Sequence, residues 1–168
     1  MIHLEKFEKK DYSELINSVK NAKDLMQFGG PEFTFPLTES QIDKTLSDKN
    51  RIAFRVADVS NGNTIGHCEI YFYDGFAKLG RILIMDKNQR GKGIGEQMVT
   101  LLLEYIFENR KERNIELNVF DFNIGAQKCY EKVGFTLNPD KKYLREVDGE
   151  TWTALNMVLN LEEWKNKN

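Results

Sequence analysis

The 168-residue sequence has few of the residues that cross-link a small protein. Its two cysteines, Cys68 and Cys129, and its two histidines, His3 and His67, do not show the paired spacing of a zinc site. A chain of this length buries about two thirds of its unfolded surface, so it needs neither a disulfide nor a metal for stability. We therefore predict one domain over residues 1–168, no metal site, and reduced core cysteines in a cytoplasmic compartment.

The sequence also lacks an excess of one charge and a long apolar run. Its 24 basic and 26 acidic side chains give a formal net charge of −2, which offers no general attraction for nucleic acid or anionic membranes. The longest apolar stretch, around residues 99–107, is interrupted by Glu104 and is too short to span a bilayer. The charged N-terminus does not read as a signal peptide. We expect neither nucleic acid nor a membrane as a partner.

The order of the predicted elements indicates a mixed α/β fold. Apolar alternation predicts a first strand at 2–8, and capping signals predict helices starting after Asp11 and after Thr38, the latter with a capping box to Gln41. Turn signals then divide an antiparallel meander into strands over 51–59, 64–73 and 76–85. The remaining predicted elements are a helix over 93–112, a strand over 115–121, a helix over 124–133, and strands near 135–137, 143–147 and 151–159. Because strand–helix–strand steps favour parallel pairing, we predict a mixed, mostly antiparallel central sheet flanked by helices.

An aromatic segment over residues 28–36 is predicted to be a loop, because glycines and prolines punctuate it. Its three phenylalanines, Phe28, Phe33 and Phe35, could line an acceptor pocket, cover a site as a lid, or form a satellite core. The sequence does not choose between these alternatives.

A glycine-rich loop joins a predicted strand to the long helix. In the segment Gln89-Arg90-Gly91-Lys92-Gly93-Ile94-Gly95, glycines at alternate positions let the backbone come close to a ligand. The loop enters a helix N-terminus, where free N–H groups and the helix dipole attract anions, and Arg90 and Lys92 add positive charge. A pyrophosphate suits such a site. The spacing fits neither a P-loop nor a dinucleotide fingerprint, which leaves a coenzyme A loop or a plain turn.

A second segment, Asn123 to Phe135, follows the next predicted strand. Its residues Ala126, Cys129, Tyr130 and Val133 recur at helical spacing and form one face, which we expect to turn toward the sheet. Tyr130 would then point inward with its hydroxyl available for a partner. From the helix position alone, a core tyrosine is the commoner case, and Asn123 is equally suited to cap the helix.

Together, the loop at 89–95 and the Asn-x-x-Ala-x-x-x-Tyr-x-x-x-Gly-Phe segment at 123–135 resemble the two signature segments of the GNAT superfamily of N-acetyltransferases. The order of elements is similar over nearly the whole chain, and the layout of both ends resembles the ribosomal-protein-alanine acetyltransferase-like branch. The resemblance implies an acyl-CoA N-acyltransferase fold. It also implies transfer of the acetyl group of acetyl-CoA to a primary amine, on a small molecule or a protein N-terminus, within a ternary complex. A homodimer is left open.

The resemblance further implies which residues hold the cofactor. Backbone groups of Leu83, Ile84 and Met85 would bind the pantetheine arm, and Asn123 would contact the same arm. The pyrophosphate would lie on the backbone N–H groups of the loop residues Arg90, Gly91, Lys92, Gly93, Ile94 and Gly95.

Tyr130 is the residue that the resemblance places nearest the chemistry. It would face the sulfur, and its hydroxyl would donate to the leaving thiolate. A backbone N–H near Ile84 or Met85 would stabilise the carbonyl oxygen when the amine attacks.

No general base is evident from the sequence. Glu69, Glu116 and His67 are candidates, although each could instead be a solvated strand residue. Asn118 stands two positions after Glu116, where some members of the superfamily carry a carboxylate. Two other functions stay open: an acyl-CoA sensor without turnover, and a protein that binds a nucleotide phosphate.

Overall fold

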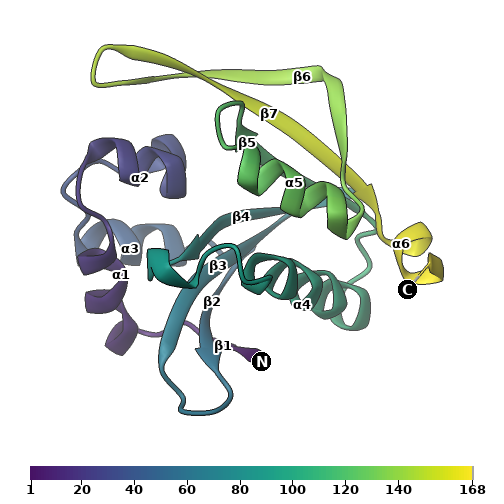
Figure 1. The fold of residues 1–168 in the computed structure, drawn as a ribbon, viewed down its shortest axis with the longest axis horizontal. Helices are drawn as coiled ribbons and strands as arrows, with labels where there is room; N and C mark the ends of the chain where they lie inside the picture. The colour runs from purple at the N-terminus through teal and green to yellow at the C-terminus, as the bar shows by residue number, and fades with distance from the viewer. Residues whose placement is uncertain (168) are drawn as a thin grey trace.

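A computed structural model of the chain describes residues 1–167. Within them, strands form at β1 (Ile2–Lys6), β2 (Arg51–Asp58), β3 (Thr64–Tyr73), β4 (Phe76–Ile84), β5 (Asn114–Phe120), β6 (Thr136–Val147) and β7 (Glu150–Asn160). They make one sheet in the order β1-β2-β3-β4-β5-β7-β6 (Figure 1). The strands β4 and β5 pair in parallel, and every other neighbouring pair is antiparallel. The predicted mixed, mostly antiparallel sheet is therefore confirmed.

The helices in the described residues are α1 (Tyr12–Ser18), α2 (Ala22–Gly29), α3 (Glu39–Leu46), α4 (Ile94–Asn109), α5 (Ile124–Val133) and α6 (Leu161–Lys167). Single 3₁₀ turns occur at Lys9–Asp11, Gly30–Glu32 and Lys87–Gln89. Neither α2 nor α6 was expected from the sequence. The predicted loop over 28–36 is wrong at its start, because Phe28 and Gly29 form the last turn of α2.

Three helix starts show how local signals act in this chain. The Asn21 side chain accepts a hydrogen bond from the Asp24 N–H at 2.8 Å and so caps α2. Thr38 caps α3 as predicted, but the Gln41 side chain bonds the backbone of Thr34 instead of closing a capping box. The helix α1 begins directly after Asp11 as predicted, but the Asp11 side chain makes no cap hydrogen bond and accepts from the Glu8 N–H instead.

Two apolar clusters pack on opposite faces of the sheet. On one face, the buried side of α4 packs with the sheet, and Tyr130 of α5 belongs to the same cluster. On the other face, Phe7 and residues of α1, α2 and α3 form the second cluster, which includes Phe28 and Phe33. Figure 1 shows α4 and α5 in front of the sheet, whereas α1, α2 and α3 lie together at the left of the view. Phe28 and Phe33 therefore belong to a satellite core.

The two strand–helix–strand steps differ in outcome. The step β4–α4–β5 gives the predicted parallel pair, but the step β5–α5–β6 does not, because β7 lies between β5 and β6. The β6–β7 hairpin extends across one side of the molecule to α2 (Figure 1). There, Lys23 forms an ion pair with Glu150 at 2.6 Å. Within the described residues, no helix is both long and apolar enough to cross a membrane.

Candidate active site

The parallel pair of β4 and β5 ends partway along both strands. The last paired residues are Leu79 and Leu117, yet β4 continues beside β3 as far as Ile84 and β5 continues beside β7 as far as Phe120. Between these continuing ends, the described residues supply no strand that pairs with the free edge of β4. The β4–β5 opening, which we define as the region beyond the Leu79–Leu117 pair, thus presents unpaired backbone groups.

The pairing register decides which backbone groups of β4 face the β4–β5 opening. The Met85 N–H donates to the Ile65 carbonyl at 3.0 Å, which marks a hydrogen-bonded pair with the chain of β3. Antiparallel pairs alternate, so Leu83, opposite His67, also directs its backbone groups to β3. Ile84, opposite Gly66, directs them to the opening. Of the predicted set, only Ile84 therefore has backbone groups that face the opening, and the contact of Leu83, Ile84 and Met85 with a cofactor stays a prediction.

A residue that the sequence analysis missed lies on the same side. Ile82 precedes Ile84 by two positions and, by the twofold period of a strand, also faces the β4–β5 opening. A bulge just before it, where the register shifts between His67 and Glu69, places Arg81 at φ 48°. An isolated glycine inside a strand, here Gly80 next to Arg81, is the sequence signal for such an irregularity.

The glycine loop leads directly into α4. Gly91 and Gly93 have φ values of 75° and 78°, in the left-handed region that favours glycine. Gly93 caps α4, and its carbonyl accepts the first helical bond from the Gln97 N–H at 3.1 Å. The N–H groups before Gln97 in this first turn have no helical acceptor, and they are the groups on which an anion can lie.

The charged side chains of the loop occupy its exposed rim. Arg90 donates to the Ile84 carbonyl at 3.1 Å, so this arginine links the loop to the free edge of β4. The Lys92 ammonium lies 3.4 Å from the Gln89 amide oxygen. Both cations are exposed, and they add positive charge beside the start of α4.

The two signature segments meet at Gly95. A β-carbon at this position would lie 3.2 Å from the Cys129 Sγ atom and 4.0 Å from the Ile84 side chain. An ion pair between Glu96 and Lys132, at 2.7 Å, joins the same two helices. The strand edge, the loop and α5 are thus brought together in space.

Asn123 precedes the first turn of α5, and Tyr130 lies in its last turn. Tyr130 is only 9% exposed and lies in the apolar cluster between α5 and the sheet. Burial raises the pKa of its hydroxyl, so Tyr130 stays protonated at neutral pH. The Asn123 side chain accepts from the Ala126 N–H at 3.3 Å and caps α5. The capping role proposed for Asn123 is confirmed, and its contact with a cofactor stays a prediction.

Glu69 and His67 are buried, so the alternative of solvated strand residues is wrong for both. The Glu69 carboxylate forms ion pairs with Arg51 and Arg81, each at 3.2 Å, and lies 2.9 Å from His67 Nε2. Burial opposes ionisation, but the hydrogen bond from His67 and the charges of Arg81 and Arg51 outweigh it and lower the Glu69 pKa from 4.5 to about 2. Such a carboxylate is a weak base.

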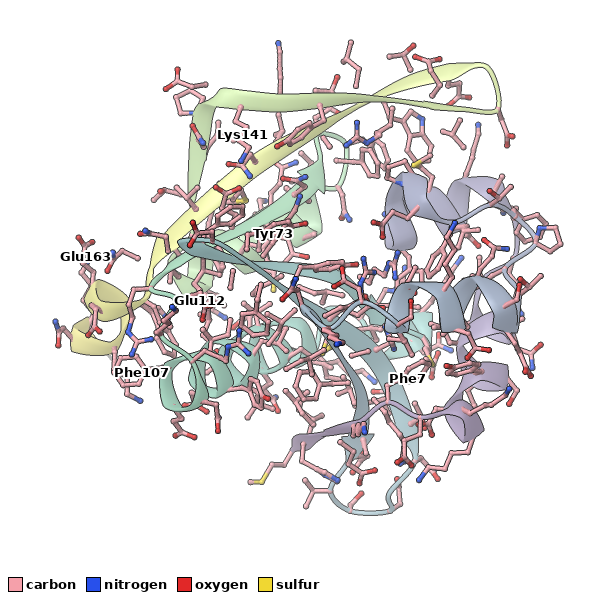
Figure 2. All side chains as sticks on the ribbon, turned by 180° about the vertical axis from the view of Figure 1, so that it is seen from behind. Phe7, Tyr73, Phe107, Glu112, Lys141 and Glu163 are labelled. Carbon is pink, nitrogen blue, oxygen red and sulfur yellow. The ribbon has the colours of Figure 1, made fainter. Side chains whose placement is uncertain are left out.

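Glu116 is also held by partners. Its carboxylate accepts from Lys141 at 2.7 Å and from the fully buried Asn156 at 3.2 Å. Lys141 lies on β6, close to where the pairing with β7 is irregular (Figure 2). Pairing between strands that are distant in the sequence brings these side chains together, which no local signal could reveal.

A cavity of about 650 Å³ lies at the end of the sheet near α6, and Glu116 is one of its lining residues. Its lining includes Phe76, Asn114, Thr136 and Trp164, but neither Tyr130 nor the loop at 89–95. Both cysteines are free, and no group of three or more potential metal ligands occurs in residues 1–167.

Comparisons with known proteins identify the family and the fold of this chain. The sequence profile of the Acetyltransferase (GNAT) family matches residues 22–135. A probable spermine N(1)-acetyltransferase of Bacillus subtilis subsp. natto is 36% identical over 70 residues, which cover 39% of this chain and 46% of the relative. An aminoglycoside N(6')-acetyltransferase of Klebsiella pneumoniae is 36% identical over 53 residues, covering 32% of this chain and 26% of the relative. The matched regions span less than half the length of these relatives.

Solved structures show the same fold at lower identity. A spermidine N-acetyltransferase from Vibrio cholerae, in complex with CoA and spermine, has a TM-score of 0.79 at 24% identity, with 98% of both chains covered. An aminoglycoside acetyltransferase in complex with coenzyme A has a TM-score of 0.76 at 20% identity, with 99% of this chain and 98% of that chain covered.

Proposed function

The chain belongs to the GNAT acetyltransferase family, and from that premise we propose that it transfers the acetyl group of acetyl-CoA to a primary amine of a small molecule. The convergence of the free β4 edge, the start of α4 and the Tyr130 helix at Gly95 supports this proposal most directly. The partial matches to spermine and aminoglycoside acetyltransferases favour a small amine as acceptor. Transfer to a protein N-terminus, and the ribosomal-protein-alanine branch, stay predictions.

The residues present fit acetyl-CoA on two counts. The unpaired N–H groups at the start of α4 suit a pyrophosphate, and Gly91, Gly93 and Gly95 keep side chains away from them. The unpaired edge of β4 suits an extended arm that carries amide groups, because such an arm can bond the edge as a further strand does. Bound acetyl-CoA supplies the thioester that the amine attacks.

On the enzyme side, we assign distinct tasks to backbone and side chain. The Ile84 N–H holds the arm, and the Ile82 N–H, two residues nearer the last β4–β5 pair, stabilises the carbonyl oxygen. Tyr130, kept protonated by burial, donates its hydroxyl hydrogen to the departing sulfur. Asn123 would contact the arm, and the exposed cations Arg90 and Lys92 would add positive charge beside the pyrophosphate.

The attacking amine loses a proton to water, and a proton from solvent restores the Tyr130 hydroxyl after the thiol has left. Glu69 does not take it, because a carboxylate with a pKa of about 2 holds protons weakly at neutral pH. Glu116 is engaged by Lys141 and Asn156. Proximity of two bound reactants then supplies much of the rate enhancement, without a covalent intermediate on the enzyme.

The test is release of free thiol from acetyl-CoA in the presence of a panel of small amines. We expect thiol release with at least one amine and stabilisation of the fold by CoA. Tight CoA binding without thiol release from any amine or peptide would favour the sensor. Stabilisation by ATP and not by CoA would favour the nucleotide-phosphate binder.

A further inference from the structure

The face of the sheet opposite α4 and α5 is the side from which an acceptor can reach the β4–β5 opening. Because Tyr130 and α4 pack on the other face, the approach from that side is filled. This face also carries the second apolar cluster, against which Leu83 and Met85 pack. In its β4–β5 part, the register places Lys78 beside Glu116 and Asn118 beside Asn156. On the β4 side, a β-carbon at Gly80 would meet the Tyr71 ring at 2.8 Å, so Tyr71 shares this face.

The carboxylates near this face are already paired with cations. Glu69 binds Arg51 and Arg81, and the exposed carboxylate of Glu32 binds the same two arginines at 3.0 and 2.7 Å. Glu116 binds Lys141 at 2.7 Å. Each of these three carboxylates is therefore already paired with at least one cation.

Two cations on the same face differ from those in the pairs. Among residues 1–167, neither Lys78 nor Arg145 has a carboxylate within ion-pair distance. Lys78 lies 5.7 Å and Arg145 lies 5.1 Å from the ring of Tyr143, so both cations gather around one aromatic side chain. The local excess of charge on this face is therefore positive.

Lys78 reaches the β4–β5 opening itself. With the Asn118 amide oriented so that its oxygen faces the ammonium group, Lys78 Nζ donates to that oxygen at 2.9 Å. Asn118 is the first β5 residue after the last β4–β5 pair. Partial burial, together with the charges of Lys141 and Arg145, lowers the pKa of Lys78, although the charges of Glu116 and Glu32 act in the opposite direction.

We propose that the acceptor amine also carries a carboxylate, and that Lys78 binds this carboxylate at the β4–β5 opening with Arg145 as a second cation. The proposal rests on the acetyltransferase function proposed above and names its substrate class. A polyamine would bring further positive charge to a face where cations are already in excess. A carboxylate would place a negative charge within ion-pair distance of the two cations and would gain charge-assisted hydrogen bonds from them.

The experiment compares glycine, β-alanine and γ-aminobutyrate, each against its own carboxamide, with spermidine as the polycation. Free thiol release gives kcat/KM for each acceptor. We expect the acid of the best pair to exceed its amide by about tenfold to a hundredfold, the range of a hydrogen bond to a charged group. Preference for the amide, or for spermidine, would overturn the proposal.

Three variants test whether Lys78 causes the preference for the acid over its amide. Lys78→Met removes the charge at nearly constant volume and should reduce the acid-to-amide ratio to about one, whereas Lys78→Arg should keep the preference. Lys142→Met, an exposed lysine on β6, is the matched control and should leave the ratio unchanged. An equal loss for acid and amide in Lys78→Met would overturn the role of Lys78.

Binding is measured separately from turnover, so that the two proposals can fail independently. Calorimetry with the CoA-saturated protein compares each acid with its amide. Selective binding of the acid, lost in Lys78→Met, would support the carboxylate site even if no amine were acetylated. Equal binding of both members of every pair would overturn it, whatever thiol release shows.

Discussion

The Cys129 Sγ atom lies 3.2 Å from the point where a β-carbon at Gly95 would stand, so the first turn of α4 and the middle of α5 approach as closely as a glycine allows. This contact joins the helix that begins at the glycine loop to the helix that carries Tyr130. The relative position of the two proposed functional parts depends on it.

Gly95→Val should destabilise the protein by about 1–3 kcal/mol, because the added side chain overpacks against Cys129. Cys129→Ala removes the sulfur and should recover part of this loss in the double variant. The measurement is the free energy of unfolding in urea for both single variants and the double variant. Strictly additive losses would show that the two positions do not interact.

Tyr130→Phe should lower kcat by about a hundredfold or more, because the departing sulfur loses its hydrogen donor. CoA affinity and the unfolding free energy should change little, since the ring remains in the apolar cluster. Tyr105→Phe, which alters a half-buried tyrosine of α4, is the control. Unchanged kcat in Tyr130→Phe would remove the tyrosine from the mechanism.

Gly93→Val should abolish CoA binding, because it places a branched side chain beside the free N–H groups of α4. A matched control exists at Gly62, which has a φ of 73° against 78° at Gly93 and, like Gly93, has open space around its β-carbon position. Both variants force a side chain into the left-handed region, at a cost of about 1–2 kcal/mol. Thermal stabilisation by CoA should be lost only at Gly93; its survival there would contradict the loop assignment.

Glu69→Gln should destabilise the protein by about 3 kcal/mol or more, since it leaves Arg51 and Arg81 buried with less counter-charge. The variant Glu32→Gln, at an exposed carboxylate that touches the same arginines, should cost less. Urea unfolding at neutral pH measures both. Equal losses would show that burial of the Glu69 charge is not what matters.

The lowered pKa of Glu69 predicts that the stability of the fold depends on pH in the acid range. Its pKa is lower in the folded protein, about 2, than the usual 4.5, so its contribution is complete above about pH 4.5 and is lost as the pH falls toward 2. We expect the unfolding free energy of the wild type to fall over this window, and to fall less in Glu69→Gln. Identical pH profiles would mean that Glu69 does not titrate there.

The sequence predicted the elements that carry strong local signals. The turns of the meander, the end of α5 at Gly134, and the inward face with Tyr130 all follow from residue type and spacing. It did not predict α2, which ends at Gly29 and Gly30. Glycine is typical both of the end of a helix and of a loop, so residue type alone does not distinguish the two.

The environment of the polar residues could not be predicted, for a different reason. The partners of Glu69 come from β2 and β4, and Lys141 reaches Glu116 across β7. Such contacts depend on strand order and register, which hydrophobic periodicity does not encode. The choice of Ile84 over Leu83 and Met85 likewise depends on the register with β3.

Because the β4–β5 pairing ends at Leu79 and Leu117, backbone atoms and side-chain atoms have different parts in recognition. In the function proposed above, main-chain amides of β4 and of the first turn of α4 hold the donor, whereas side chains form the surface from which the acceptor would enter. We therefore expect substitutions on that surface to change the preferred amine while the backbone contacts to the donor are kept.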